Sequence, residues 1–207
     1  MAAAYDYLTM ALGRGRAAWQ AFATYANGPG DEAVARVGGE FVGLFAPQLG
    51  FASNEAAVLV RWPIGERGPT SALAGANGVV GCHVDALTPT LRPRVGQELR
   101  SGGIYVHRWF VVDGERVADF VELSGQAWGG FEGAYDTEIF GLFTATPTPE
   151  DEAKGQGRLL LLTWYASHGV WEASREQAAD PQSLFARRHE LTRSTIGRSS
   201  LLIPRGP

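Results

Sequence analysis

The chain has 207 residues, 45% of them hydrophobic and 19% charged, a composition typical of a globular protein with a substantial core. Its 18 basic and 22 acidic side chains give a net charge of −4, which argues against nucleic acid or an anionic membrane as a partner. The single cysteine, Cys82, excludes an intrachain disulfide and is expected to be a small core residue. With no apolar run near the ~20 residues of a membrane span and no signal-like amino terminus, we expect a cytoplasmic protein.

The first half of the chain predicts a strand, a helix and two further strands. Residues 5–12 favour a strand, and a helical stripe follows at i, i+3, i+4 and i+7 (Trp19, Phe22, Ala23, Ala26). The run Asn27-Gly28-Pro29-Gly30 is expected to end that helix. One strand then begins at Glu40 and another ends at Trp62, before a Gly-rich stretch over residues 65–81.

The second half predicts the same series with a longer last part. Residues 104–112 favour a strand, and Val117, Phe120 and Val121 favour a helix after it. A strand begins at Glu138, and residues 144–158, rich in Pro and acidic side chains, are expected to form a mobile loop. Asp180-Pro181 is a favourable helix start, and residues 201–203 predict a closing strand for this half.

The two halves repeat each other. Glu40-Phe41-Val42-Gly43-Leu44-Phe45 returns as Glu138-Ile139-Phe140-Gly141-Leu142-Phe143, with four of six positions identical. We therefore predict an internal duplication with units at residues 1–97 and 98–207. The order β-α-β-β-α-β is that of an α+β ferredoxin-like unit, and two such units can cover their bare sheet faces by packing sheet to sheet as an intrachain α/β barrel.

The second half resembles a NIPSNAP-type domain of the dimeric α/β-barrel superfamily. The resemblance rests on Tyr-Val-His-Arg-Trp-Phe at 105–110, the Glu-Ile-Phe-Gly-Leu-Phe strand, Leu-Thr-Trp-Tyr-Ala-Ser at 162–167 and Ala-Asp-Pro at 179–181. The first half departs from it at residues 65–81. The resemblance implies an interior that holds a small molecule, in a superfamily that includes cofactor-free monooxygenases, isomerases, cyclases and some haem enzymes, but it implies no single reaction.

The strand at 104–112 carries the main candidate site residues. Successive side chains face opposite sides, so Tyr105, His107 and Trp109 share one face while Arg108 and Phe110 share the other. The resemblance favours Arg108 and Phe110 as pocket residues, whereas bulk favours the other set, and the sequence leaves the choice open. A charged or imidazole group in an apolar pocket could perform acid–base chemistry, or it could be a hydrogen-bonded core group.

Further candidates come from carboxylates and aromatic residues. Glu40 and Glu138 open equivalent strands and could act as an acid and base pair, or simply cap strand ends in water. Aromatic residues near the loop ends of the second half could line a pocket mouth or belong to the core (Trp128, Phe131, Tyr135, Trp164, Tyr165, Trp171).

Cofactor signals are weak. The four histidines show no metal spacing, so we predict no bound metal and a colourless protein. His189 is the candidate axial ligand if haem is bound, and its neighbours Arg187, Arg188 and Arg193 predict a solvated basic face or an anion contact. Residues 13–18, Gly-Arg-Gly-Arg-Ala-Ala, have the form of a dinucleotide fingerprint, which the second half lacks.

The leading hypothesis is a protein that binds a small apolar or aromatic molecule, with His107, Arg108 and Glu138 as candidate catalytic residues. It includes a cofactor-independent enzyme of monooxygenase, isomerase or cyclase type. The alternative is a non-catalytic binding or assembly module, and a homo-oligomer is compatible with both.

Overall fold

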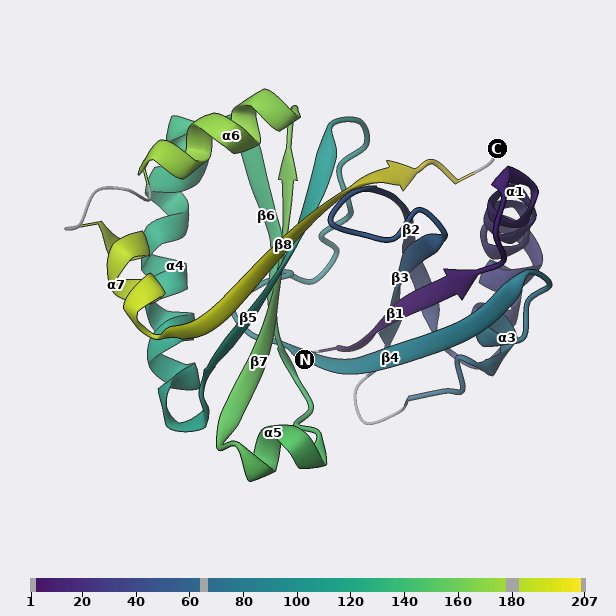
Figure 1. Cartoon of the computed structure of the whole chain (residues 1–207), viewed down its shortest axis with the longest axis horizontal. Coiled ribbons are helices and arrows are strands. Elements are labelled where there is room, and N and C mark those ends of the chain that lie inside the picture. Colours follow the sequence, from purple (N-terminus) through teal and green to yellow (C-terminus); the bar gives the residue numbers. More distant parts are fainter. Residues whose placement is uncertain (1–2, 64–66, 178–182, 206–207) are drawn as a thin grey trace. The chain divides into compact units, whose positions relative to one another are not determined.

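The computed structural model describes residues 3–63, 67–177 and 183–205 (Figure 1). The protein is of the α+β class, and the chain divides into two compact units. Unit 1 contains Met1–Thr88 together with Ser199–Pro207, and unit 2 contains Pro89–Arg198. No helix in the described part of the chain combines the length and the apolar character that crossing a membrane would require.

Unit 1 has the strand order of a ferredoxin-like unit. Its strands lie in the order β4-β1-β3-β2, and β1 pairs antiparallel with both β3 and β4. The chain order is β-α-β-β-α-β, as the sequence predicts, although the second helix is a single turn. The elements are β1 (Ala4–Leu12), α1 (Arg16–Tyr25), η1 (Ala26–Gly30), α2 (Asp31–Arg36), β2 (Glu40–Leu49), β3 (Glu55–Trp62), α3 (Ser71–Ala74) and β4 (Val79–Pro89).

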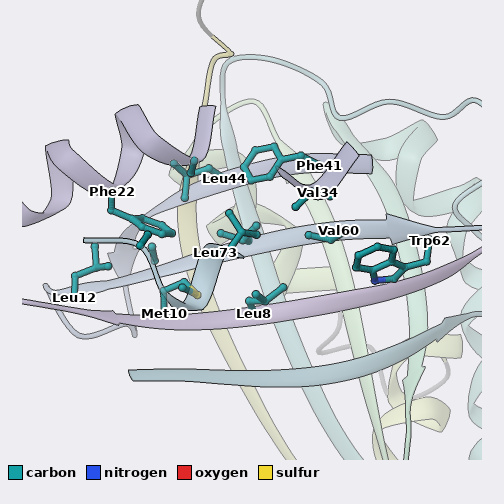
Figure 2. Packing of buried hydrophobic residues seen from close by; sticks show 14 residues of the cluster. Leu8, Met10, Leu12, Phe22, Val34, Phe41, Leu44, Val60, Trp62 and Leu73 are labelled. Carbon is teal, nitrogen blue, oxygen red and sulfur yellow. The ribbon is translucent and has the colours of Figure 1, made fainter. Parts of the chain in front are cut away.

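The core of unit 1 lies between its sheet and its helices (Figure 2). Leu8, Met10 and Leu12 alternate along β1 and all face this core, where Phe22 of α1 and Leu73 of α3 meet them. Each of these side chains is at most 1% exposed. Burying apolar surface of this kind favours folding by ~25 cal/mol per Å².

The helix of unit 1 continues where the sequence predicts that it ends. Residues 27–30 lie within η1, a single π-helical turn that contains Pro29 and leads directly into α2. A wider turn can accommodate a proline, which lacks the N–H of a regular helical turn. Gly30 permits close packing here, because a Cβ at this position would lie 3.0 Å from Leu73 Cδ2. Tertiary packing therefore outweighs the local helix-breaking signal.

Unit 2 has the same order with a larger helical layer. Its strands lie in the order β8-β5-β7-β6, and β7 pairs antiparallel with β5 and β6. Helices α4, α6 and α7 lie together on one side of these strands (Figure 1). The elements are β5 (Ile104–Asp113), η2 (Gly114–Arg116), α4 (Val117–Ala134), β6 (Thr137–Ala145), α5 (Pro149–Ala153), β7 (Gln156–Tyr165), α6 (His168–Gln177), α7 (Leu184–Glu190) and β8 (Thr192–Ile203).

The repeated Glu-x-x-Gly-Leu-Phe segment has the same backbone feature in both units. The pairing register shifts between Phe41 and Gly43 in β2 and between Ile139 and Gly141 in β6. Such a bulge bends a strand, and glycine is favoured beside it. At Gly141 a Cβ would lie 2.8 Å from the Phe143 ring, so a larger residue would not fit there without rearrangement. The shared bulge is consistent with internal duplication, which itself stays a prediction, as does the packing of two sheets against each other.

The closing strand differs from the sequence expectation. Residues 201–203 were expected to complete the second half, but they pair with β2 of unit 1, with Ile203 opposite Leu44. The strand β8 is 12 residues long, and residues 192–198 belong to unit 2 while residues 199–203 belong to unit 1. The residues of this one strand thus belong to both units, so a single cut of the chain into two halves does not separate the units.

Three local expectations also need correction or lie outside the described residues. Residues 144–158, predicted to form a loop, contain the short helix α5, in which Thr148 and Asp151 form a reciprocal cap. Cys82 is exposed on β4 and is not a core residue, because α3 is too short to cover that strand. The predicted helix start at Asp180-Pro181 lies outside the described residues; α7 begins at Leu184, where the Ser183 hydroxyl accepts a hydrogen bond from the Ala186 N–H.

Candidate functional site

A cavity of about 360 Å³ lies between the sheet and the helices of unit 2. Its walls come from β5, β6, β7 and β8 on one side and from α4, α6 and α7 on the other. We call it the unit 2 pocket. It is lined by Val106, Arg108, Phe110, Trp128, Phe131, Ile139, Leu161, Thr163, Tyr165, Ser174, Arg175, Phe185, Arg188, His189 and Thr195.

The strand β5 places one of the two candidate faces in this pocket. Val106, Arg108 and Phe110 face the helices, and the Phe110 ring lies 4.8 Å from the ring of Phe120 in α4. Across the sheet, Arg108 is opposite Leu161 and Phe110 is opposite Leu159. Because side chains alternate along a strand, Tyr105, His107 and Trp109 face away from the pocket. Of the two strand faces that the sequence leaves open, the face with Arg108 and Phe110 therefore lines this pocket.

Arg188 is the most unusual side chain of the pocket. It is 7% exposed, and its guanidinium carbon lies 5.1 Å from the Phe110 ring centre, 5.4 Å from that of Phe120 and 5.0 Å from that of Phe185. Its buried Nη1 has no hydrogen-bond partner among the described residues. Burial lowers the pKa of Arg188 to about 10, and the positive charge of Arg108 adds to that effect. The structure thus corrects the expectation of a solvated basic face at this residue.

Arg108 and Tyr165 lie beside Arg188. Burial lowers the pKa of Arg108 and raises the pKa of Tyr165, whose phenol shares a hydrogen bond with Ser174. Tyr165 packs edge-on against Phe131, with the ring centres 6.2 Å apart. The pocket therefore places two mostly buried guanidinium groups and one phenol against aromatic walls.

The free polar atoms of the pocket residues are donors. The indole Nε1 of Trp128 is buried and, like Arg188 Nη1, has no partner among the described residues. Arg175 and His189 add further nitrogen groups at the more exposed side. No carboxylate belongs to the described lining of the pocket. Unpaired buried donors are destabilising, and a ligand that supplies acceptors would satisfy them.

The other sequence candidates lie outside this pocket. The Tyr105 hydroxyl donates to the Arg100 carbonyl at 2.9 Å, and the Trp164 indole donates to the Gly102 carbonyl at 2.8 Å while Arg100 stacks 3.7 Å from its ring centre. Trp109 contacts Arg158, whose guanidinium carbon lies 5.6 Å from its ring centre. These three residues therefore have local partners that suit a structural role.

His107, Tyr135 and the two glutamates are also placed away from the pocket lining. His107 is fully buried, and its pKa is lowered to about 3 by burial and by the nearby charge of Arg198. Tyr135 packs at 5.6 Å against Phe131 behind the pocket wall. Glu138 accepts a 3.4 Å hydrogen bond from Gln97, while Glu40 pairs with Arg61 in unit 1. Each glutamate thus has a partner within its own unit.

Several pocket residues were not singled out by the sequence. Thr163, Ser174, Phe185 and Thr195 line the pocket without belonging to any motif. A signal for Arg188 was present, because Arg187, Arg188 and His189 are consecutive on α7 and a helix of seven residues cannot expose all of them equally. Deciding which one is buried requires the positions of α4 and β5.

His189 lines the pocket and is the imidazole that could meet a haem iron there, but its side chain is exposed on α7. The cavity volume is at the lower end of the range for small-molecule sites, ~300 to 1,000 Å³. Among the described residues there is also no group of three or more His, Cys, Asp or Glu side chains that could hold a metal ion.

The dinucleotide interpretation of residues 13–18 is wrong. Gly15 precedes α1 with a φ of 108°, as a tight turn requires, but β1 pairs antiparallel with both of its neighbours. The fingerprint functions at the end of a parallel strand in a β-α-β unit, where the helix amino terminus faces the pyrophosphate. The glycines here serve the turn between β1 and α1.

Comparison with known proteins shows the fold. No protein-family model and no curated protein matches the chain. Among solved structures, a monooxygenase-like protein of Lactobacillus acidophilus matches with a TM-score of 0.59 and 10% identity, over 100% of this chain and 98% of that one. An anthrone oxidase-like protein matches with a TM-score of 0.59 and 9% identity, over 98% and 92%.

A haem-binding protein of Thermus thermophilus also matches, with a TM-score of 0.54 and 9% identity over 99% of this chain and 93% of that one. A further match, from Listeria monocytogenes, is a ferredoxin fold protein with a TM-score of 0.52 and 10% identity, which agrees with the ferredoxin-like fold that the sequence predicts. At such low identity the similarity concerns the fold alone.

Proposed function

We propose that the protein binds a small aromatic molecule in the unit 2 pocket. The observation that carries the proposal is the lining itself, in which aromatic rings surround a few polar groups in a cavity of about 360 Å³. Aromatic walls provide apolar contact area, and a small number of polar groups orient a ligand. We also propose that the second half is related to NIPSNAP-type domains, a relation that its sequence motifs support.

The strand β8 offers a matched pair of variants to test it. Thr195 lines the pocket, whereas the next residue, Ile196, faces the other way and is 56% exposed. Thr195→Trp should fill the pocket, and Ile196→Trp should add the same side chain to the outer surface. The measurement is calorimetric titration of each protein with 2-naphthamide, an uncharged two-ring probe.

We expect the parent and Ile196→Trp to bind 2-naphthamide with similar affinity and Thr195→Trp to bind it at least about 10-fold more weakly, a loss of about 1.4 kcal/mol. Equal binding by all three proteins would place the ligand elsewhere. No binding by the parent at millimolar probe would contradict an aromatic pocket.

A cofactor-independent enzyme is a second candidate, favoured by the cations and the imidazole that share this pocket. Removing an acidic proton from an aromatic substrate leaves an anion, which Arg108 and Arg188 would stabilise. His189 lines the same pocket and is the candidate proton acceptor, because a neutral imidazole has one ring nitrogen that can accept a proton.

Anthrone is a suitable probe substrate, because one structural neighbour is an anthrone oxidase-like protein. In the expected reaction with O₂, the CH₂ carbon loses two hydrogens and gains one oxygen, and the second oxygen atom leaves as water. Oxygen uptake above that of Thr195→Trp, and lowered in His189→Ala, would support catalysis. Uptake at the Thr195→Trp level with intact binding would favour the non-catalytic binding role.

A further inference from the structure

We propose that the natural ligand of the unit 2 pocket is an aromatic carboxylate whose anionic group binds Arg188 within the ring of Phe110, Phe120 and Phe185, with Arg108 as the second cation. The inference rests on the proposed function, because it names the class of molecule for the same pocket. It goes further by assigning an anion anchor on α7.

Arg188 is buried among aromatic rings. Its side chain is 7% exposed, and its buried Nη1 has no hydrogen-bond partner among the described residues. Contacts with three aromatic rings recover only part of the hydration that an arginine loses on burial. A buried, unpaired cation is unfavourable for the ligand-free fold, so its position is explained best by an anion that binds there.

Further positive charges lie in the surroundings of Arg188. Arg108 acts on Arg188 as a neighbouring positive charge, and Arg175 acts on Arg108 in the same way. Like charges in one cavity repel each other, and an anion between them would convert that repulsion into attraction. No carboxylate in the described lining fills that place.

Shape and donor geometry favour a carboxylate. A guanidinium presents a planar pair of N–H donors that matches the two oxygens of a carboxylate. The unpaired Trp128 indole offers one more donor in the same lining, while Phe131, Phe185 and Leu161 offer apolar walls. The pocket therefore suits an acid with one or two aromatic rings, in which the rings fill the cavity and the carboxylate meets the arginines.

The test compares 2-naphthoate with 2-naphthamide, two probes of nearly the same shape that differ in charge. By calorimetric titration at neutral pH, the parent should bind naphthoate at least about 30-fold more tightly than naphthamide. Arg188→Met should weaken naphthoate binding at least about 30-fold and change naphthamide binding by less than about threefold. Arg187→Met is the matched control, since Arg187 is the exposed neighbour on α7.

The possible outcomes separate the two proposals. Equal binding of both probes by the parent would overturn the anion anchor and leave the aromatic pocket standing. Binding of neither probe would overturn both. If Arg187→Met lost as much naphthoate affinity as Arg188→Met, the effect would come from surface charge. A naphthoate affinity that falls steeply between about 0.05 and 0.5 M salt would lead to the same conclusion, because buried pairs are screened weakly. If Arg188→Met does not fold, the comparison of the two probes on the parent and on Arg108→Met decides the question.

Discussion

Replacing Arg188 by methionine should stabilise the ligand-free protein, which is the opposite of the usual effect of a buried substitution. Methionine is flexible, has a similar length and packs favourably against aromatic rings. It would occupy the space among Phe110, Phe120 and Phe185 without a charge to desolvate. The prediction follows because the buried Nη1 of Arg188 has no hydrogen-bond partner among the described residues.

The size of the effect can be worked out from the pKa of Arg188. Burial, together with the positive charge of Arg108, lowers this pKa from 12.5 to about 10. At about 1.36 kcal/mol per pKa unit, holding the charge in this place costs about 3 kcal/mol. The cation–π contacts return about 1 to 2 kcal/mol of that cost. The substitution should therefore raise the free energy of unfolding by about 1 to 2 kcal/mol, equivalent to about 2 to 8 °C in Tm.

Urea unfolding and calorimetry on the ligand-free proteins would measure this change. Arg187→Met, the exposed control on the same helix, should change stability by less than about 0.5 kcal/mol. Saturation with 2-naphthoate should reverse the order, because ligand at 100 times Kd adds about 2.7 kcal/mol to the parent and much less to Arg188→Met. A destabilisation of about 2 kcal/mol or more in the ligand-free state would refute the reasoning, since it would mean that the guanidinium is paired in the folded protein.

Three further predictions concern buried polar groups. In unit 1, Asp6 accepts a 2.7 Å hydrogen bond from Trp62 Nε1 and pairs with Arg67, so in urea titrations Asp6→Ala should cost about 3 to 5 kcal/mol and Asp6→Asn, which keeps an acceptor, less than half of that. Burial alone would raise the pKa of Asp151, but hydrogen bonds from Gln156, Thr148 and Arg158 hold this pKa well below its usual range. The resulting stability is present above about pH 4 and is lost as the pH falls. Asp151→Asn should abolish this dependence of stability on acid pH. Burial and the nearby charge of Arg198 lower the pKa of His107 to about 3. The stability from neutral His107 is therefore complete above about pH 6.5 and should fall by up to about 1.4 kcal/mol per pH unit below it. An equally steep fall in His107→Gln would contradict this assignment.

The sequence predicted the order of elements because hydrophobic periodicity reports which side of an element is buried. The strands at β1 and β5 and the stripe in α4 agree with the structure, although burial does not alternate at residues 5–8 and 104–107, where both faces of the strand are covered. The repeated glycine motif also had a local cause, the strand bulge at Gly43 and Gly141. These features depend on neighbouring residues in the chain, so they can be read from it.

Features that depend on distant segments could not be predicted in this way. Alternation separates Arg108 from His107 but does not state which face the helices cover, and that choice depends on where α4, α6 and α7 pack. Arg188 has the sequence context of a surface residue, and its burial results from three phenylalanines on α4, α7 and β5. The partner of residues 199–203 is β2, whose paired residues lie 150 to 159 positions earlier in the chain, and no local pattern specifies it.

A comparison of the two units explains why the pocket is in unit 2. If Tyr5 is aligned with Tyr105, the positions of Arg108 and Phe110 on β5 correspond to Leu8 and Met10 on β1, and both of these side chains are 0% exposed. In unit 1 the matching space is filled by Leu8, Met10, Phe22 and Leu73, which pack together as a closed core (Figure 2).

Unit 2 differs at the same place in two respects. An arginine replaces the core leucine on the strand, and two helices, α6 and α7, stand where unit 1 has the single turn α3. The longer helical layer encloses a volume that the side chains do not fill, and the arginines give that volume its charge. Unit 1 thus has the features of a closed structural core, and unit 2 has those of a candidate binding site.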